Sequence, residues 1–513
     1  KLTQDIDLSA NSGFYIPYVA GGLNTNNRTV DSLSLSQYTS NLGLVGHFRS
    51  ASDTTTSSLA VNGTIGGLTN LGLVAGSSWQ RSFSNMDVSG TVAGSDLVYE
   101  KTPTNDIRDQ NENGYSNVGG LVGYAWGSST TALTLSNLTS SVSVTGVNNV
   151  GGLAGRIEYG AIADSSSTGT IETVAITGVT SPKWTGGLVG SLLQSNSSLK
   201  RSFHAVGLVK GYDYVGGLVG ELAGNLGELL DASTPDYSTY VTSNVQGFGA
   251  RIGGLVGFHN SGSATNLSMS GTVTGWRVND DINYAGFFVG GITGYSNAAI
   301  SYAKYVGSLV QGGHQTGGVT GHIGAALTQS FSTGDVKSNS NYVGGLVGTS
   351  QIVTNSYATG DVFASGERVG GLVGQAGNYV ANSYASGRVS GTYSDSGLNY
   401  SGNYTGGLVG ITGHEIKDSY FDGQVVKGGH RTGGLVGHST NYVTRSYATG
   451  KVDSNSSWVG GLVGYSGHYI RDNSYSTGDV SGTDRIGGLV GYGSYVNDSY
   501  ATGNVTSSSS YVG

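Results

Sequence analysis

The sequence contains no cysteine, which excludes disulfide cross-links and thiolate metal sites. It has only 4 prolines in 513 residues. Charged residues make up 11% of the chain, far below the roughly 25% of ordinary soluble domains. No apolar run approaches the roughly 18 residues of a membrane-spanning helix, and a net charge of −8 offers no basic surface for nucleic acid. We therefore expect neither membrane insertion nor nucleic-acid binding.

Glycine is abundant instead, with 90 residues, and 37% of the chain is hydrophobic. Glycine-rich chains are often disordered, but the apolar residues of this chain recur at fixed places, which argues against disorder. The segment Val-Gly-Gly-Leu-Val-Gly occurs intact at 118–123, 215–220, 343–348, 369–374 and 459–464. From Gly294 onward its closing glycine recurs in steps of 27, 27, 26, 36, 27, 27 and 27 residues. The chain is thus built from repeats of about 27 residues.

A second element lies midway in each repeat and reads Asn-Ser-Tyr-Ala-Thr-Gly-Asp-Val at 355–362. Several glycines in each repeat would each cost about 1 kcal/mol in a helix, whereas the valine, threonine and tyrosine residues favour strands. Three short apolar runs in each repeat predict one coil of a parallel β-helix. We expect an all-β, right-handed β-solenoid, because parallel crossovers strongly prefer that hand.

The Gly-Gly-Leu-Val-Gly core followed by Ser-Tyr-Ala-Thr-Gly resembles the GLUG-motif repeats. These occur in large bacterial surface and secreted proteins, including filamentous-haemagglutinin-like adhesins and non-catalytic parts of some streptococcal immunoglobulin A proteases. The resemblance covers about 42–513, and it implies an extracellular or cell-surface location without supplying catalytic residues. Leu2 to Ser9 also resembles the first strand of such β-helices.

The regularity of the repeat divides the chain into three parts. We expect 1–41 to form an N-terminal cap and opening coil, 42–293 to form irregular coils with corner insertions, and 294–513 to form regular coils. Tyr511-Val512-Gly513 matches Tyr342-Val343-Gly344, so the sequence stops at the start of another motif. We expect the coils to continue beyond this point or to be covered there by another molecule, because an open strand edge is an aggregation template.

An aromatic residue recurs in the second element and predicts a ladder of rings. The ladder could be an exposed strip that stacks on sugar rings, or a stack packed within or against the coil wall that forms the core together with the valine and leucine columns, which we favour. The residue after the turn glycine varies and is expected to face solvent, with Asp361 beside Arg388 and Lys451 beside Asp479. The ladder comprises Phe83, Phe203, Tyr302, Phe331, Tyr357, Tyr384, Tyr420, Tyr447, Tyr475 and Tyr500.

Few residues suggest metal chemistry. The densest acidic cluster could bind Ca²⁺ through hard oxygen ligands, although a solvated acidic loop explains it better, and we otherwise expect no cofactor. Two histidine pairs, His314 with His322 and His430 with His438, each flank one motif without an obvious third ligand. The acidic candidates are Asp96, Glu100, Asp106, Asp109 and Glu112.

Two insertions, 275–288 and 391–404, carry aromatic residues, and insertions in solenoids emerge at corners where ligands often bind. Strengthening of a coil corner is the competing interpretation. A threonine array at 359, 449, 477 and 502 would suit ice binding, but Ser386 and Asp422 interrupt it. The ligand-binding candidates are Trp276, Arg277, Tyr284, Tyr393, Tyr400 and Tyr404.

We expect a non-enzymatic extracellular structural or adhesive protein, a rigid adhesin or matrix-fibre segment that displays corner loops. Its expected partners are glycans or proteins of a host cell or matrix, or further copies of itself, end to end or side by side. Parallel β-helices also form polysaccharide lyases and hydrolases, whose sites need carboxylates gathered on neighbouring coils. The alternative is therefore a spacer or carbohydrate-binding part of a larger secreted polysaccharide-active enzyme or protease.

Overall fold

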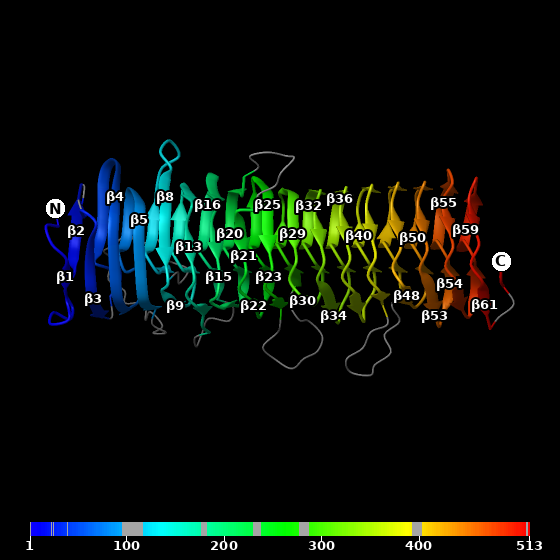
Figure 1. Cartoon of the computed structure of the whole chain (residues 1–513), viewed down its shortest axis with the longest axis horizontal. Coiled ribbons are helices and arrows are strands. Elements are labelled where there is room, and N and C mark those ends of the chain that lie inside the picture. Colours follow the sequence, from blue (N-terminus) through cyan, green and yellow to red (C-terminus); the bar gives the residue numbers. More distant parts are fainter. Residues whose placement is uncertain are drawn as a thin grey trace, which may run out of the picture. The chain divides into compact units, whose positions relative to one another are not determined.

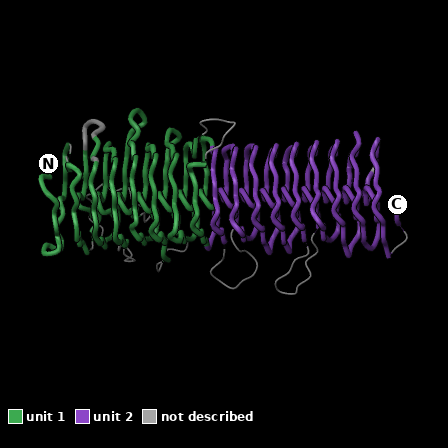
Figure 2. The backbone as a smooth tube through the Cα atoms, in the orientation of Figure 1, with its two compact units in different colours: residues 1–247, 254–263 green, residues 248–253, 264–513 purple. Residues whose placement is uncertain are grey.

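The computed structural model describes residues 2–21, 23, 25–37, 39–94, 116–175, 182–228, 237–275, 287–391, 403–508 and 511–513. These residues form strands and turns and contain no helix. Accordingly, no helix in the described part of the chain could cross a membrane. Two compact units are present, one formed by 1–247 with 254–263 and the other by 248–253 with 264–513 (Figure 2). We call them unit 1 and unit 2.

A single coil of unit 2 explains the repeat. Its strands are β35 (Val343–Gly344), β36 (Val347–Thr354), β37 (Tyr357–Ala358) and β38 (Val362–Ala364). Each strand pairs in parallel with its equivalent in the next coil, as in Val343 with Val369 and Val362 with Val389. Val343, Leu346, Val347, Val353 and Val362 are fully buried inside the coil. The predicted parallel β-helix is confirmed.

The coils place equivalent strands in columns (Figure 1). Strands that open the six-residue motif form the motif column, and strands with the recurrent aromatic residue form the aromatic column. In unit 2 the motif column includes β27 (Phe287–Gly290), β31 (Thr316–Gly317), β35, β39 (Val369–Gly370), β44 (Thr405–Gly406), β49 (Thr432–Gly433), β54 (Ser457–Gly460) and β58 (Asp484–Gly487). The aromatic column comprises β33 (Phe331–Ser332), β37, β42 (Tyr384–Ala385), β47 (Tyr420–Phe421), β52 (Tyr447–Ala448), β56 (Tyr475–Ser476) and β60 (Tyr500–Ala501).

Unit 1 follows the same plan less regularly. Strands β4 (Val45–Gly67) and β5 (Ala75–Gly94) are long and pair in parallel from Val45 with Ala75 to Gly67 with Gly94, with one register shift after Arg49. Strand β1 (Ile6–Asp7) pairs in parallel with β3 (Arg28–Ser36), so residues before 42 already join the parallel pairing. The hand of the coil and the division at 41 and 293 stay predictions.

The second glycine of each motif lies where successive coils touch. A methyl group on Gly434 would overlap the carbonyl oxygen of Gly461, and the same holds for Gly407 against Gly434. None of these glycines has a positive φ, so close approach of two backbones, rather than conformational freedom, requires glycine here.

A column of buried serines, which the sequence analysis did not anticipate, also joins the coils. Ser419 donates a hydrogen bond from Oγ to the carbonyl oxygen of Lys417 (2.8 Å) and accepts one from the backbone N–H of Ser383 in the preceding coil (3.2 Å). The backbone N–H of Ser419 in turn donates to Ser446 Oγ (3.2 Å). The column comprises Ser330, Ser356, Ser383, Ser419, Ser446 and Ser474.

Replacing Ser419 with alanine is expected to lower the free energy of unfolding by about 1–3 kcal/mol, because the buried N–H of Ser383 loses its acceptor. Urea denaturation of unit 2 would measure this loss. The exposed Thr449→Ala is the control and should change stability by less than about 0.5 kcal/mol. Equal effects of the two changes would show that the serine column does not contribute to stability.

Candidate functional site

The residue before each motif adopts a left-handed conformation although it is not glycine. We call this position the corner column, and in its last six coils aromatic and arginine residues alternate. The φ angles are 61° at Tyr404, 59° at Arg431 and 63° at Trp458. The corner column in these coils comprises Tyr342, Arg368, Tyr404, Arg431, Trp458 and Arg485.

A second left-handed position in each coil provides an internal comparison. There the residues are mostly short and polar, such as Asn355, Asn382 and Asp418, which tolerate this conformation because their side chains can hydrogen-bond locally. Bulky residues in the left-handed region are genuine outliers, and such strain clusters at functional sites. Large side chains in the corner column are thus a reason to look for function there.

Arg431 is enclosed by aromatic rings. Its guanidinium carbon lies 5.0 Å from the ring centre of Tyr404, 4.8 Å from that of Trp458 and 5.2 Å from that of Tyr465. Its Nη1 donates hydrogen bonds to the hydroxyl of Tyr404 (2.9 Å) and to Nδ1 of His438 (3.3 Å). Cation–π contacts of this kind hold the guanidinium in one place.

The residue after the closing glycine of each motif adds a second row of rings beside the corner column. His438 stacks on Tyr465 with ring centres 4.6 Å apart, and Tyr465 lies 5.6 Å from Tyr492. Trp458 stacks on Tyr492 at 4.9 Å and on Tyr465 at 5.5 Å. Together these residues form one continuous surface, which we call the arginine–aromatic strip: Tyr404, Arg431, His438, Trp458, Tyr465, Arg485 and Tyr492.

The strip carries positive charge that no acid neutralises at its centre. Among the described residues, no carboxylate lies within 4 Å of Arg431, and its Nε has no hydrogen-bond partner. Burial and, to a smaller extent, the charge of Arg431 together lower the pKa of His438 to about 4. His438 is therefore neutral at pH 7, where its Nδ1 can accept the hydrogen bond from Arg431.

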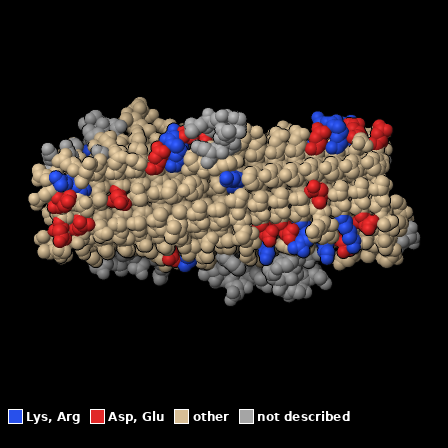
Figure 3. Space-filling view, viewed as in Figure 1, with Lys and Arg blue, Asp and Glu red and all other residues tan. Residues whose placement is uncertain are grey.

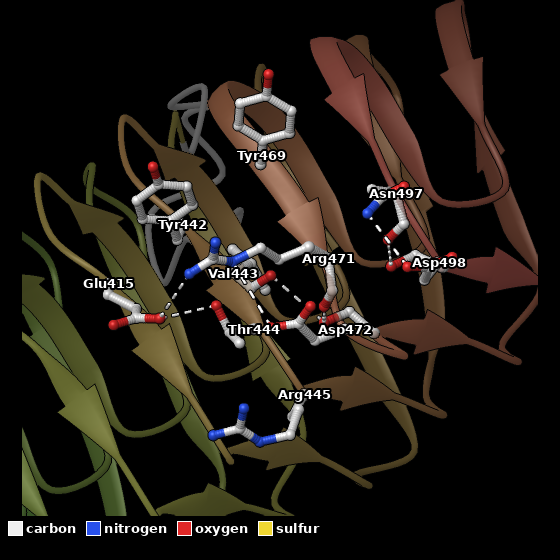
Figure 4. A network of polar contacts seen from close by, with 12 residues as sticks. Glu415, Tyr442, Val443, Thr444, Arg445, Tyr469, Arg471, Asp472, Asn497 and Asp498 are labelled. Atoms are coloured by element: carbon white, nitrogen blue, oxygen red, sulfur yellow. Dashed lines mark hydrogen bonds and ion pairs between the residues drawn. The ribbon is translucent and has the colours of Figure 1, made fainter.

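Other arginines at the surface of unit 2 lie close to the carboxylates of aspartate or glutamate residues. Arg471 also lies over a tyrosine, with its guanidinium carbon 4.1 Å from the ring centre of Tyr442. Figure 4 shows this guanidinium extending toward Glu415, which lies 4.0 Å from it and accepts a hydrogen bond from Thr444 Oγ1 (2.8 Å). Arg445 forms an ion pair with Asp418 at 2.6 Å. Figure 3 shows several small groups in which side chains of opposite charge lie together, beside single ones. Arg431 differs from Arg445 and Arg471 because no described carboxylate lies within 4 Å of it.

Several coils that contain the corner column also match a known sequence motif. The GLUG motif matches residues 146–172, 339–362, 365–390 and 428–453. The chain carries GLUG-motif repeats. Searches of curated proteins and of solved structures found no match. The matches in unit 2 contain Tyr342, Arg368 and Arg431, so the corner column is part of the GLUG repeat.

The aromatic residues form the expected stack against the coil wall, but the rings lie outside the core, which corrects our expectation that they form it with the valine and leucine columns. In the coils from Phe331 to Tyr475 each ring lies half-buried on the outer side, while the next residue, such as Ala385, Phe421 or Ala448, is fully buried. Tyr384, Tyr420 and Tyr447 stack with ring centres 4.9 Å apart and planes within 1° of parallel. Because each ring face is covered by the next ring, the exposed sugar-stacking strip is not formed either.

Two members of the predicted ladder lie elsewhere. Phe83 is fully buried and pairs with Leu135 in the core of unit 1. Tyr302 lies two residues before its expected place, because Lys304 pairs with Phe331. The Asp361–Arg388 pair forms, at 2.6 Å. Asp479 accepts a hydrogen bond from the backbone N–H of Asn504 (2.8 Å), and the described residues show no ion pair between it and Lys451.

Of the predicted ligand-binding residues, the structure places only Tyr404, and it lies in the arginine–aromatic strip. The other candidates lie outside the described residues: Trp276, Arg277, Tyr284, Tyr393, Tyr400, and the acidic Asp96, Glu100, Asp106, Asp109 and Glu112. No group of three or more metal-ligating side chains is placed to hold an ion in the described part of the chain. His322 stacks on Tyr295 at 4.5 Å and His430 contacts Trp458 at 4.6 Å, so these histidines pack against rings.

The sequence analysis missed Arg431, Trp458 and Tyr465. A signal was available, since the residue before the motif alternates between aromatic and arginine over six successive repeats. The alternating residue lies one place before the first residue of the six-residue motif, outside the segment that defines the repeat.

Lowering the pH from 7 to 5 is expected to destabilise unit 2. The pKa of His438 is about 4 in the folded protein and about 6.5 in an unfolded chain. The unfolded state therefore binds more protons between these values, so stability falls as the pH drops below about 6.5. The carboxylates with lowered pKa values, such as Asp418, respond only at more acidic pH.

Urea denaturation at pH 7 and pH 5 checks this expectation, and His438→Gln should reduce the difference between the two midpoints. Titration of the His438 imidazole by NMR should give a midpoint near 4. A midpoint at the ordinary histidine value would contradict the packing described for this ring.

Proposed function

We propose that the protein is a non-enzymatic extracellular repeat protein of a bacterium, an adhesin or matrix-fibre segment whose coils present side chains to glycans or proteins of another surface. The observation that carries the proposal is the arginine–aromatic strip. Repetition of one coil places Tyr404, Arg431 and Trp458 side by side in strained left-handed conformations. Rings and guanidinium groups on a surface suit recognition of carbohydrates and proteins.

Several features support a binding role over catalysis. Several described acids form ion pairs with an arginine of a neighbouring coil, as Asp361 does with Arg388, Asp418 with Arg445 and Asp164 with Arg201. Catalysis of glycoside cleavage needs a pair of carboxyl groups free to act as acid and base. The resemblance of the repeats to those of large bacterial surface proteins supports an extracellular location. On this proposal, function requires no metal or cofactor.

The proposal is tested by binding the full chain to a glycan array and to wells coated with extracellular-matrix proteins. Binding that Trp458→Ala abolishes, but that the exposed Trp126→Ala in unit 1 leaves intact, would support it. The same preparation is assayed against common polysaccharides. Turnover that is lost on replacing a single aspartate or glutamate would overturn the proposal in favour of a secreted enzyme. Retention of self-association without any glycan or protein binding would favour a purely structural fibre.

A further inference from the structure

The charge of unit 2 is distributed in a way that the net charge of −8 does not suggest. Arginines occupy every second place of the corner column, at Arg368, Arg431 and Arg485, with Tyr404 and Trp458 between them. Among the described residues, no carboxylate lies within 4 Å of Arg368 or Arg431, and Arg485 has only Asp484, at 3.8 Å. This column is therefore a row of cations on a chain that is otherwise acidic.

The spacing of the row follows from the fold. Successive coils lie about 4.8 Å apart, so arginines in alternate coils are separated by roughly 10 Å along the unit. The rings between them hold each guanidinium in place, as Tyr342 does for Arg368 (4.5 Å) and Tyr404 does for Arg431 (5.0 Å). A ligand that matches the row would carry negative charge at the same regular interval.

The chemistry of the contacts narrows the ligand further. A planar guanidinium pairs with carboxylate or sulfate oxygens through two hydrogen bonds. Aromatic side chains between the cations offer apolar edges and hydroxyl groups, which suit a sugar. Ring faces within the strip are already covered by neighbouring rings, as at Tyr465 and Tyr492. We therefore expect ion pairs with the arginines, and not stacking on neutral sugars, to contribute most of the binding free energy.

We propose that the corner column binds an acidic polysaccharide with one negative charge in every second sugar, and that the polysaccharide chain runs across successive coils. This inference rests on the proposed function and names the class of glycan for it. An extended pyranose unit is about as long as the spacing between one coil and the next, about 5 Å, so a disaccharide matches the separation of two arginines. One charged and one uncharged sugar thus follow the alternation of arginine and aromatic residues, and Arg431 at the centre makes the principal ion pair.

The test measures equilibrium binding of the full chain to hyaluronan, whose carboxylates recur at every second sugar. Polygalacturonate, with a carboxylate on every sugar, and neutral dextran are measured in parallel. We expect hyaluronan to bind, polygalacturonate to bind more weakly and dextran not to bind. Affinity for hyaluronan should fall as sodium chloride is raised, because ion pairs at an exposed surface are screened by salt.

Matched variants identify the residue responsible. Arg431→Gln should weaken hyaluronan binding by about tenfold or more, as expected for a lost charge-assisted pair. Arg471→Gln removes another arginine that lies over a tyrosine, but one that has Glu415 as partner, and it should change affinity by less than about twofold. Arg431→Lys keeps the charge and should retain part of the binding, which separates loss of charge from loss of fold.

Equal weakening by Arg431→Gln and Arg471→Gln would overturn the inference, as would equal binding of dextran or absence of hyaluronan binding. If the array finds another glycan whose binding does not depend on Arg431, the proposed adhesive function stands and this inference fails. If hyaluronan and every other glycan and matrix protein fail to bind, both are wrong.

Discussion

Replacing Gly434 with alanine is expected to lower the free energy of unfolding of unit 2 by about 3–5 kcal/mol, the upper range for one substitution. The added methyl group would overlap the carbonyl oxygen of Gly461 in the next coil. Backbone atoms on both sides are held by parallel pairing, such as Thr432 with Val459, so neither can move away without breaking hydrogen bonds. Urea denaturation, with hydrogen exchange to locate the effect, would measure the loss.

Gly413→Ala is the matched control. Gly413 is an exposed glycine of the same unit, and a methyl group there would meet only the hydroxyl oxygen of Thr440 at an ordinary distance of 3.8 Å. We expect a change within about 0.5 kcal/mol. In a repeat protein each coil contacts mainly its neighbours, so the Gly434 variant should lose exchange protection first in the adjoining coils. Comparable stability of the two variants would show that the coils can separate locally.

Replacing Phe421 with alanine is expected to destabilise unit 2 by about 3–5 kcal/mol, as removal of a buried phenylalanine ring does. The adjacent change, Tyr420→Ala, should cost less, about 1–3 kcal/mol. Tyr420 is half-buried on the outer side and loses two ring contacts, to Tyr384 and Tyr447 at 4.9 Å each, each worth about 0.5–1.5 kcal/mol beyond burial. Calorimetric or urea denaturation would compare the two.

This pair of variants tests which residue of the two-residue strand β47 faces inward. A larger loss for Tyr420→Ala would mean that the ladder of rings forms the core, as first expected, and that the register of the aromatic column is wrong. Tyr447→Ala serves as a replicate, because Ala448 occupies the inward position there and the ring of Tyr447 also stacks on two neighbours, Tyr420 and Tyr475, at 4.9 Å each.

The fold could be predicted because one physical requirement repeats in every coil. Close contact between backbones demands glycine at positions such as Gly407 and Gly434, and buried strands demand valine or leucine at positions such as Leu435 and Val436. Parallel pairing places like residues above one another, so both demands recur with the period of one coil. The repeat length of about 27 residues is therefore sufficient to predict the parallel β-helix.

Whether the rings lie on the inner or the outer side of the coil could not be predicted in the same way. A strand of two residues, such as β52 with Tyr447 and Ala448, shows no alternation that distinguishes the inner from the outer side. Alanine and tyrosine can each occupy either side, and Phe421 occupies the inner position where neighbouring coils have alanine. Irregular coils add to the difficulty, since Tyr302 resembles a ladder residue in sequence although Lys304 holds that place.

The candidate site was predicted only in part. Tyr404 was found because it ends an insertion rich in tyrosine. Arg431 and Trp458 lie in coils of ordinary length, and nothing about their immediate sequence marks them as functional. Their importance arises from contacts across coils and from a left-handed conformation, neither of which a linear sequence shows.

The pairing around the longest repeat has a practical consequence. The step from Gly374 to Gly410 is 36 residues, nine more than the usual 27, yet Val369 still pairs with Thr405 and Val389 with Val426. Extra sequence after Gly391 thus leaves the register of both flanking coils unchanged. The chain length available between Gly391 and Tyr404 makes this corner a place where an epitope, a tag or a short enzyme-cleavage sequence could be grafted while the neighbouring coils keep their parallel pairing.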